Sequence, residues 1–157
     1  MVEHVLTENV LKELLSTLSY FHEIPDEELQ RILGLLKLKT VMAQEIIIKQ
    51  GDIGDALFLI ARGKVEVLLR QGEEEKKIAV LKEGDIFGEM ALIQNKPRSA
   101  SCIAITDCIL YELDRDDLDT VINYCPKLHH ALIYIGKERR FSVLHPYYYK
   151  RLTQKQD

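Results

Sequence analysis

At 157 residues, of which 46% are hydrophobic and 29% charged, the chain is long enough for one domain with a buried core and too short for two full domains. Its formal net charge of −4 argues against a surface that coats nucleic acid, because such a surface is basic. Charged residues interrupt the N-terminal segment, which therefore lacks the apolar core of a signal peptide. No run reaches the ~20 apolar residues of a membrane span.

The three cysteines, Cys102, Cys108 and Cys125, form no Cys-x-x-Cys pair and leave an odd one over. This pattern fits a reducing compartment with buried structural thiols better than a disulfide framework. We therefore expect a cytoplasmic protein, or the cytosolic face of a membrane protein, with no direct insertion into the bilayer.

Residues 1–37 predict a helical lead-in. Apolar residues recur at helical spacing between residues 5 and 18 and again after Pro25, at Leu29, Ile32, Leu33 and Leu36. The acidic residues 26–28 would complement the dipole of the second helix at its N-terminus. These helices also offer a surface through which the chain could form an oligomer.

Residues 38–114 show the short period of β-strands separated by glycine-containing turns. Segments 64–70 and 109–113 largely alternate, whereas segments 45–49 and 57–60 are apolar enough for burial on both faces. Turns are expected at 51–55, 62–63, 71–73 and 83–85, with the acidic run 73–75 as a solvated hairpin tip. Seven or eight strands at this spacing indicate a sandwich or barrel.

Residues 115–142 predict a short helix followed by a long one. Asp114 is placed to cap the first helix, whose buried face would carry Leu118, Val121 and Ile122. Pro126 opens the second helix, in which a stripe of apolar residues should face the strands: Leu128, Leu132 and Ile135. Residues 143–157 show no clear period and are expected to form a loosely held tail.

One segment, residues 84–101, carries the chemistry. It reads GDIFGEMALIQNKPRSAS and places a carboxylate, Glu89, and a guanidinium, Arg98, at the two ends of a short apolar turn. Gly88 lets backbone approach closely, and the N–H groups of residues 90–93 together with the forked donor of Arg98 suit a phosphate. The segment predicts a site for a small ligand with a hydroxyl group and an anion.

This segment resembles the phosphate-binding cassette of cyclic nucleotide-binding domains through its F-G-E-x-A-L core and its P-R-S-A ending. The order of predicted helices and strands is similar to that family over about residues 11–140. The resemblance implies an α+β fold, with an eight-stranded antiparallel, jelly-roll-like β-roll between N-terminal helices and a C-terminal short helix plus long lid helix. It also implies binding of cyclic AMP or cyclic GMP without catalysis.

The resemblance assigns roles residue by residue. Glu89 would accept a hydrogen bond from the ribose 2′-hydroxyl, and Arg98 would pair with the exocyclic oxygens of the cyclic phosphate. Backbone N–H groups of Gly88, Ala91 and Ser99 would complete the phosphate cradle. Contacts with the base are expected from five residues: Val80, Leu81, Met90, Ile135 and Arg139. Arg139 either stacks on the base or is an ordinary solvated arginine.

The choice of base stays open, with cyclic AMP favoured. A guanine-selective site needs an acceptor, and the only acid between residues 126 and 141, Glu138, lies on a different helix face from Arg139. A hydroxyl of Ser99 or Ser101 could still bond to guanine. The alternative to nucleotide binding is a degenerate, ligand-free structural domain in which Glu89 and Arg98 simply pair with each other.

Rival functions lack their residues in this sequence. None of the five histidines falls within the predicted roll, so we expect neither a cupin-type metal site nor a hydrolase. The 17 residues after Arg140 are too few for a helix-turn-helix domain. The end of the last helix, residues 137–140, is similar to that of bacterial cyclic-nucleotide-gated potassium channels. We expect a regulatory module whose last helix moves on binding and whose partner is a channel pore or another effector.

Overall fold

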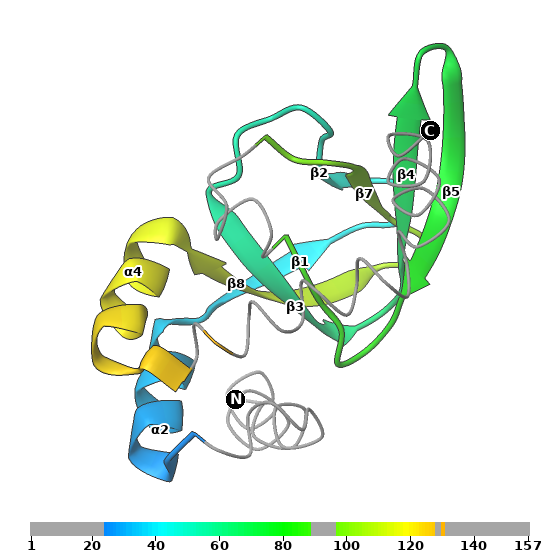
Figure 1. The fold of residues 1–157 in the computed structure, drawn as a ribbon. Coiled ribbons are helices and arrows are strands. Elements are labelled where there is room, and N and C mark those ends of the chain that lie inside the picture. The colour runs from blue at the N-terminus through cyan, green and yellow to red at the C-terminus, as the bar shows by residue number, and fades with distance from the viewer. Residues whose placement is uncertain (1–23, 89–96, 128–129, 131–157) are drawn as a thin grey trace.

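The computed structural model describes residues 24–88, 97–127 and 130 (Figure 1). In these ranges two helices flank eight strands, which makes the fold α+β. The elements follow one another as α2 (Asp26–Leu35), β1 (Lys37–Val41), β2 (Ile46–Ile48), β3 (Ala56–Arg62), β4 (Val65–Gln71), β5 (Glu74–Leu81), β6 (Ile86–Phe87), β7 (Ser101–Ala104), β8 (Cys108–Asp114) and α4 (Arg115–Tyr124).

The eight strands form two antiparallel four-stranded sheets. One sheet has the order β1-β8-β3-β6 and the other the order β2-β7-β4-β5. The predicted burial of segment 45–49 on both faces is wrong: β2 is the edge strand of its sheet, and Ile46 is 60% exposed while Ile48 is buried. An edge strand has no neighbour on one side, so its apolar composition alone could not predict how much of it is covered.

Strand β3 is buried on both faces, as its composition predicts, because it separates two apolar clusters. Phe58 and Ile60 belong to the cluster between the two sheets, together with Cys102 and Cys108. The intervening residues of β3, Leu57 and Leu59, belong to a second cluster that contains residues of α2 and α4 and also Cys125. Alternate side chains of a strand point to opposite faces, so one strand contributes to both clusters. All three cysteines are buried, as expected.

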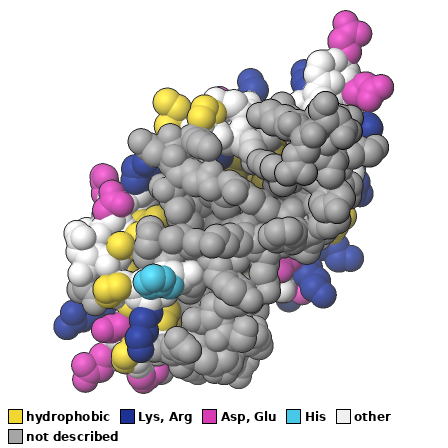
Figure 2. Space-filling model, in the orientation of Figure 1, with side chains coloured by type: hydrophobic (Ala, Val, Ile, Leu, Met, Phe, Trp, Pro, Cys, Tyr) yellow, Lys and Arg dark blue, Asp and Glu magenta, His cyan; other side chains and the backbone are white. Residues whose placement is uncertain are grey.

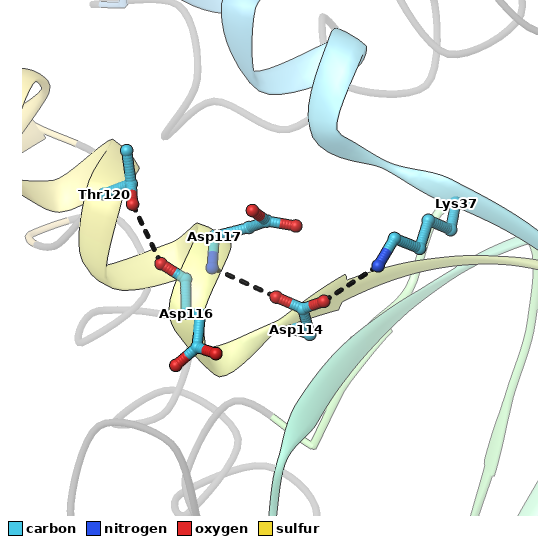
Figure 3. Close-up of polar contacts among 5 residues, drawn as sticks. All are labelled: Lys37, Asp114, Asp116, Asp117 and Thr120. Atoms are coloured by element: carbon cyan, nitrogen blue, oxygen red, sulfur yellow. Dashed lines mark hydrogen bonds and ion pairs between the residues drawn. The ribbon is translucent and has the colours of Figure 1, made fainter.

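The two described helices pack on one side of the β1-β8-β3-β6 sheet (Figure 1). The expected acidic first turn of α2 is present, at residues 26–28. Asp114 caps α4 as expected: its Oδ1 accepts a hydrogen bond from the Asp117 amide at 3.0 Å (Figure 3). Its other oxygen lies 2.9 Å from Lys37 Nζ, at the start of β1. Leu118 and Val121 form the buried face of α4, as their spacing predicts.

The β4–β5 hairpin projects from the body of the molecule (Figure 1). The acidic run 73–75 lies at its tip and is exposed, as expected, and Figure 2 shows acidic side chains gathered there. Glycines in all four predicted turns have positive φ: Gly51, Gly63, Gly72 and Gly84.

The helix predicted before residue 24, the long lid helix and the tail lie outside the described residues. Within the described ranges no helix is long and apolar enough to cross a membrane.

Candidate functional site

The guanidinium of Arg98 is the centre of the candidate site. Arg98 is 7% exposed and is the one buried charged side chain in the described ranges. Its Nη1 donates to the carbonyl of Gly88 at 2.6 Å, and its Nη2 donates to the carbonyl of Ala56 at 2.5 Å. Gly88 directly follows β6, and Ala56 begins β3. The guanidinium is therefore fixed between the ends of two neighbouring strands.

The main chain of Arg98 is held as firmly as its side chain. Its N–H donates to the carbonyl of Asp52 at 2.8 Å, and its carbonyl accepts from the N–H of Gly51 at 2.9 Å. Next to this contact, Ile53, which follows Asp52, and Pro97, which precedes Arg98, form an isolated antiparallel bridge. The glycine-containing turn 51–55 thus supports the residues that end the cassette.

Gly88 occupies a position that only glycine fits comfortably. Its φ is +85°, and a Cβ on it would lie 2.8 Å from Arg98 Nη1 and 3.1 Å from the Ala56 carbonyl oxygen. Any larger residue would strain the backbone and push on the guanidinium. The close contact that Gly88 permits in this structure is with the guanidinium of Arg98, and close approach of a ligand to its backbone stays a prediction.

The two serines after Arg98 differ in their surroundings. Ser99 is exposed, and its N–H as part of the phosphate cradle stays a prediction. Ser101 is partly buried, and its Oγ accepts a hydrogen bond from the Gln50 N–H at 2.9 Å. A hydroxyl can still donate while it accepts, so Ser101 keeps the capacity proposed for it toward guanine.

The predicted base contacts on the roll lie on opposite faces of β5. Val80 is 48% exposed, whereas Leu81 is 4% exposed and belongs to the cluster between the sheets. Leu81 therefore packs mainly as a core residue. The remaining predicted site residues lie outside the described residues: Glu89, Met90, Ala91, Ile135 and Arg139.

This arrangement favours the binding of an anion. Burying an arginine removes its charge from water, so the group depends on oriented acceptors such as the Gly88 and Ala56 carbonyls. The guanidinium is permanently charged, and its fork matches the oxygens of a carboxylate or phosphate. Within the described ranges no group of three or more histidine, cysteine or acidic side chains could hold a metal ion.

Three supporting contacts were not predicted from the sequence: the Ala56 carbonyl, the main chain of residues 51–52, and Gln50. The turn at 51–55 is recognisable from its glycines, but nothing in the local sequence shows that it pairs with residues 97–98. Backbone carbonyls carry no sequence signal, because every residue has one.

The sequence profile of the cyclic nucleotide-binding domain matches residues 38–125, more than half of the chain. The chain therefore belongs to the cyclic nucleotide-binding domain family, as the cassette predicts.

Curated relatives agree with this assignment. The chain is 36% identical over 113 residues to the cyclic AMP receptor protein of Thermus thermophilus, a match that covers 71% of this chain and 52% of that protein. It is 34% identical over 95 residues to the cAMP-dependent protein kinase regulatory subunit of Eremothecium gossypii, covering 60% of this chain and 20% of that subunit. The chain thus spans about half or less of the length of these relatives.

Solved structures share the fold. The Thermus thermophilus catabolite activator protein superposes with a TM-score of 0.70 at 35% sequence identity, covering 76% of this chain and 57% of that one. The regulatory domain of Toxoplasma gondii PKA, crystallised with cAMP, superposes with a TM-score of 0.68 at 28% identity, covering 71% of this chain and 43% of that one.

Proposed function

We propose that this chain is a regulatory module that binds a cyclic nucleotide, with cyclic AMP favoured over cyclic GMP. The observation that carries the proposal is the buried Arg98 guanidinium, held by the Gly88 and Ala56 carbonyls at the end of the cassette. A relative named as a cyclic AMP receptor and a related domain crystallised with cAMP support the choice of ligand.

In this proposal Arg98 pairs with the exocyclic phosphate oxygens, and the ribose 2′-hydroxyl donates to Glu89. Backbone N–H groups of Gly88, Ala91 and Ser99 complete the cradle. The base contacts residues of the roll and of the last helix: Val80, Leu81, Met90, Ile135 and Arg139. Residues 1–37 form the helical lead-in, 38–114 the roll with its cassette at 84–101, 115–142 the C-terminal helices and 143–157 the tail.

The module would act by a population shift in the cytoplasm. Ligand in the cassette favours one position of the flanking helices, and their movement reaches an effector protein. The relatives described above are a receptor protein and kinase regulatory subunits, so a channel pore as the effector stays a prediction.

The test is calorimetric titration with cyclic AMP, cyclic GMP and 5′-AMP. We expect cyclic AMP to bind most tightly and 5′-AMP most weakly, because the ring-opened phosphate carries an additional charge and a different shape. Tighter binding of cyclic GMP would reverse the proposed preference. No binding of either cyclic nucleotide would favour the ligand-free alternative, in which Glu89 and Arg98 pair with each other.

A further inference from the structure

In the β2-β7-β4-β5 sheet, β7 is too short to pair with the end of β4, and the side chain of Gln50 takes the place of the missing strand residues. Strands β4 and β7 pair from Val65 opposite Ala104 to Leu68 opposite Ser101. Continued by two residues, this register would place Ser99 opposite Arg70. The chain instead turns away at residues 97–100, where Arg98 pairs with the turn at 51–52.

The side chain of Gln50 takes the vacated place beside Arg70. Its Oε1 accepts from the Arg70 N–H at 2.8 Å, and its Nε2 donates to the Arg70 carbonyl at 3.0 Å. Two such bonds with one residue reproduce the pattern of a hydrogen-bonded antiparallel pair. The amide side chain thus stands in for the missing stretch of β7 and gives the exposed Arg70 N–H and carbonyl a protein partner in place of water.

The main chain of Gln50 acts on the other side of the same gap. Its N–H donates to Ser101 Oγ at 2.9 Å, and the next residue, Gly51, donates its N–H to the Arg98 carbonyl. Gln50 is therefore anchored to the hairpin by its side chain and to both ends of segment 98–101 by the backbone that it begins.

We propose that Gln50 is a positioning residue for the phosphate site: by replacing the lost strand partner of Arg70, it fixes the turn 51–53 on which Arg98 rests. The inference rests on the proposed function for its ligand, but its structural step, from Gln50 to the main chain of Arg98, does not. The two parts can be measured separately.

The variant Gln50→Met keeps the length of the side chain and removes both hydrogen bonds. Without ligand, we expect amide hydrogen exchange at Arg70, Gly51 and Arg98 to become at least about tenfold faster. With cyclic AMP, we expect about a tenfold loss of affinity, which corresponds to one or two hydrogen bonds of ordinary strength. Gln50→Glu retains the acceptor for the Arg70 N–H and should keep more of the protection at that amide than Gln50→Met.

Two control variants separate positioning from general stability. Glu75→Gln weakens the exposed ion pair of Arg70, whose Nη2 lies 3.5 Å from Glu75 Oε2, and leaves the main chain of Arg70 bonded to Gln50. Ile32→Val removes a buried methylene group from the cluster between the helices and the β1-β8-β3-β6 sheet, and so lowers stability away from the site. Neither variant should change affinity or the protection of the Gly51 and Arg98 amides.

If Gln50→Met exposes only the Arg70 amide, and Gly51 and Arg98 stay protected, Gln50 merely closes the sheet and the proposal is wrong. The proposal also fails if affinity falls equally in Ile32→Val, because loss of binding would then follow stability alone. A wild-type chain that binds no cyclic nucleotide would overturn the proposed function. The exchange measurements would still decide whether Gln50 positions Arg98.

Discussion

The guanidinium of Arg98 is buried, and two of the groups that it contacts are the backbone carbonyls of Gly88 and Ala56. These two carbonyl contacts orient the guanidinium. Orientation before binding reduces the entropy that a ligand has to overcome. At the scale of single residues, the oriented guanidinium supports the proposed phosphate site.

Replacement of Arg98 by alanine should weaken cyclic AMP binding by roughly 2–5 kcal/mol, as expected when one partner of a desolvated charge pair is lost. Calorimetric titration measures the difference. Arg62→Ala, which changes an exposed arginine at the opposite end of β3 from Ala56, serves as the control and should bind like the wild type. A loss below about threefold in Arg98→Ala would contradict the assignment of the phosphate site.

Gly88→Ala should reduce both stability and affinity. The positive φ of +85° costs a non-glycine residue about 1–3 kcal/mol, and the added Cβ lies 2.8 Å from Arg98 Nη1. The matched control is Gly72→Ala, because Gly72 also has a positive φ but has nothing within 4 Å of the added Cβ. Urea unfolding and calorimetry should show a stability loss in both variants and an affinity loss in Gly88→Ala alone. Equal affinities in the two variants would mean that Gly88 does not position Arg98.

Among the elements, α4 contacts both Lys37, at the start of β1, and the turn 51–55, which pairs with the end of the cassette. Lys37, the first residue of β1, lies two residues after the end of α2 and pairs with Asp114, the residue that caps α4. Arg115, the first residue of α4, donates from Nη2 to the Gly54 carbonyl at 2.7 Å, within the turn whose residues 51–53 pair with residues 97–98. The N-terminus of α4 thus contacts both the start of β1 and the turn that supports Arg98.

The Asp114 contacts should make stability depend on pH at both extremes (Figure 3). The hydrogen bond from the Asp117 amide, with the bond from Lys37, lowers the pKa of Asp114 below its ordinary 3.8. The ionised Asp114 therefore adds to the free energy of unfolding above pH 3.8. This stabilisation is lost as pH falls through the lowered pKa of Asp114. The hydrogen bond and charge of Asp114 raise the pKa of Lys37 above 10.5. The stabilisation from protonated Lys37 is therefore lost as pH rises through this raised pKa.

Two variants at position 114 separate the cap from the ion pair. Asp114→Asn keeps a capping oxygen and loses the charge, whereas Asp114→Ala loses both, so alanine should destabilise the domain more than asparagine. Urea unfolding between pH 3 and pH 7 checks this order. Both variants should lack the decrease in the free energy of unfolding that protonation of the Asp114 carboxylate causes at low pH. If asparagine and alanine were equally destabilising, the cap would contribute nothing measurable.

In the molecule as a whole, the two apolar clusters meet across β3. Its residues Phe58 and Ile60 face the roll, and Leu57 and Leu59 face the helices. Because the packing is close, we expect a shift of the helices to displace β3, which begins with Ala56, a partner of Arg98. This arrangement gives the proposed population shift a continuous physical route between site and helices.

The proposed lid should gain order with ligand. If Ile135 and Arg139 close over the base, cyclic AMP should increase hydrogen-exchange protection between residues 127 and 140. A chain truncated just after Pro126 should retain a folded roll, bind weakly and hardly distinguish adenine from guanine. The lid proposal is wrong if the segment is equally protected with and without nucleotide and the truncated chain keeps full affinity and preference.

Local chemistry in the sequence determined the strands, the four glycine turns, the acidic start of α2, the cap at Asp114 and the family, because each depends on residues close together in the chain. Tertiary structure alone decided that β2 lies at an edge and that Leu81 packs in the core. It also decided that Arg98 is held by a carbonyl 42 residues away and that Gln50 replaces a strand partner of Arg70. Such contacts depend on strand register and on backbone groups common to all residues, and neither leaves a pattern in the sequence.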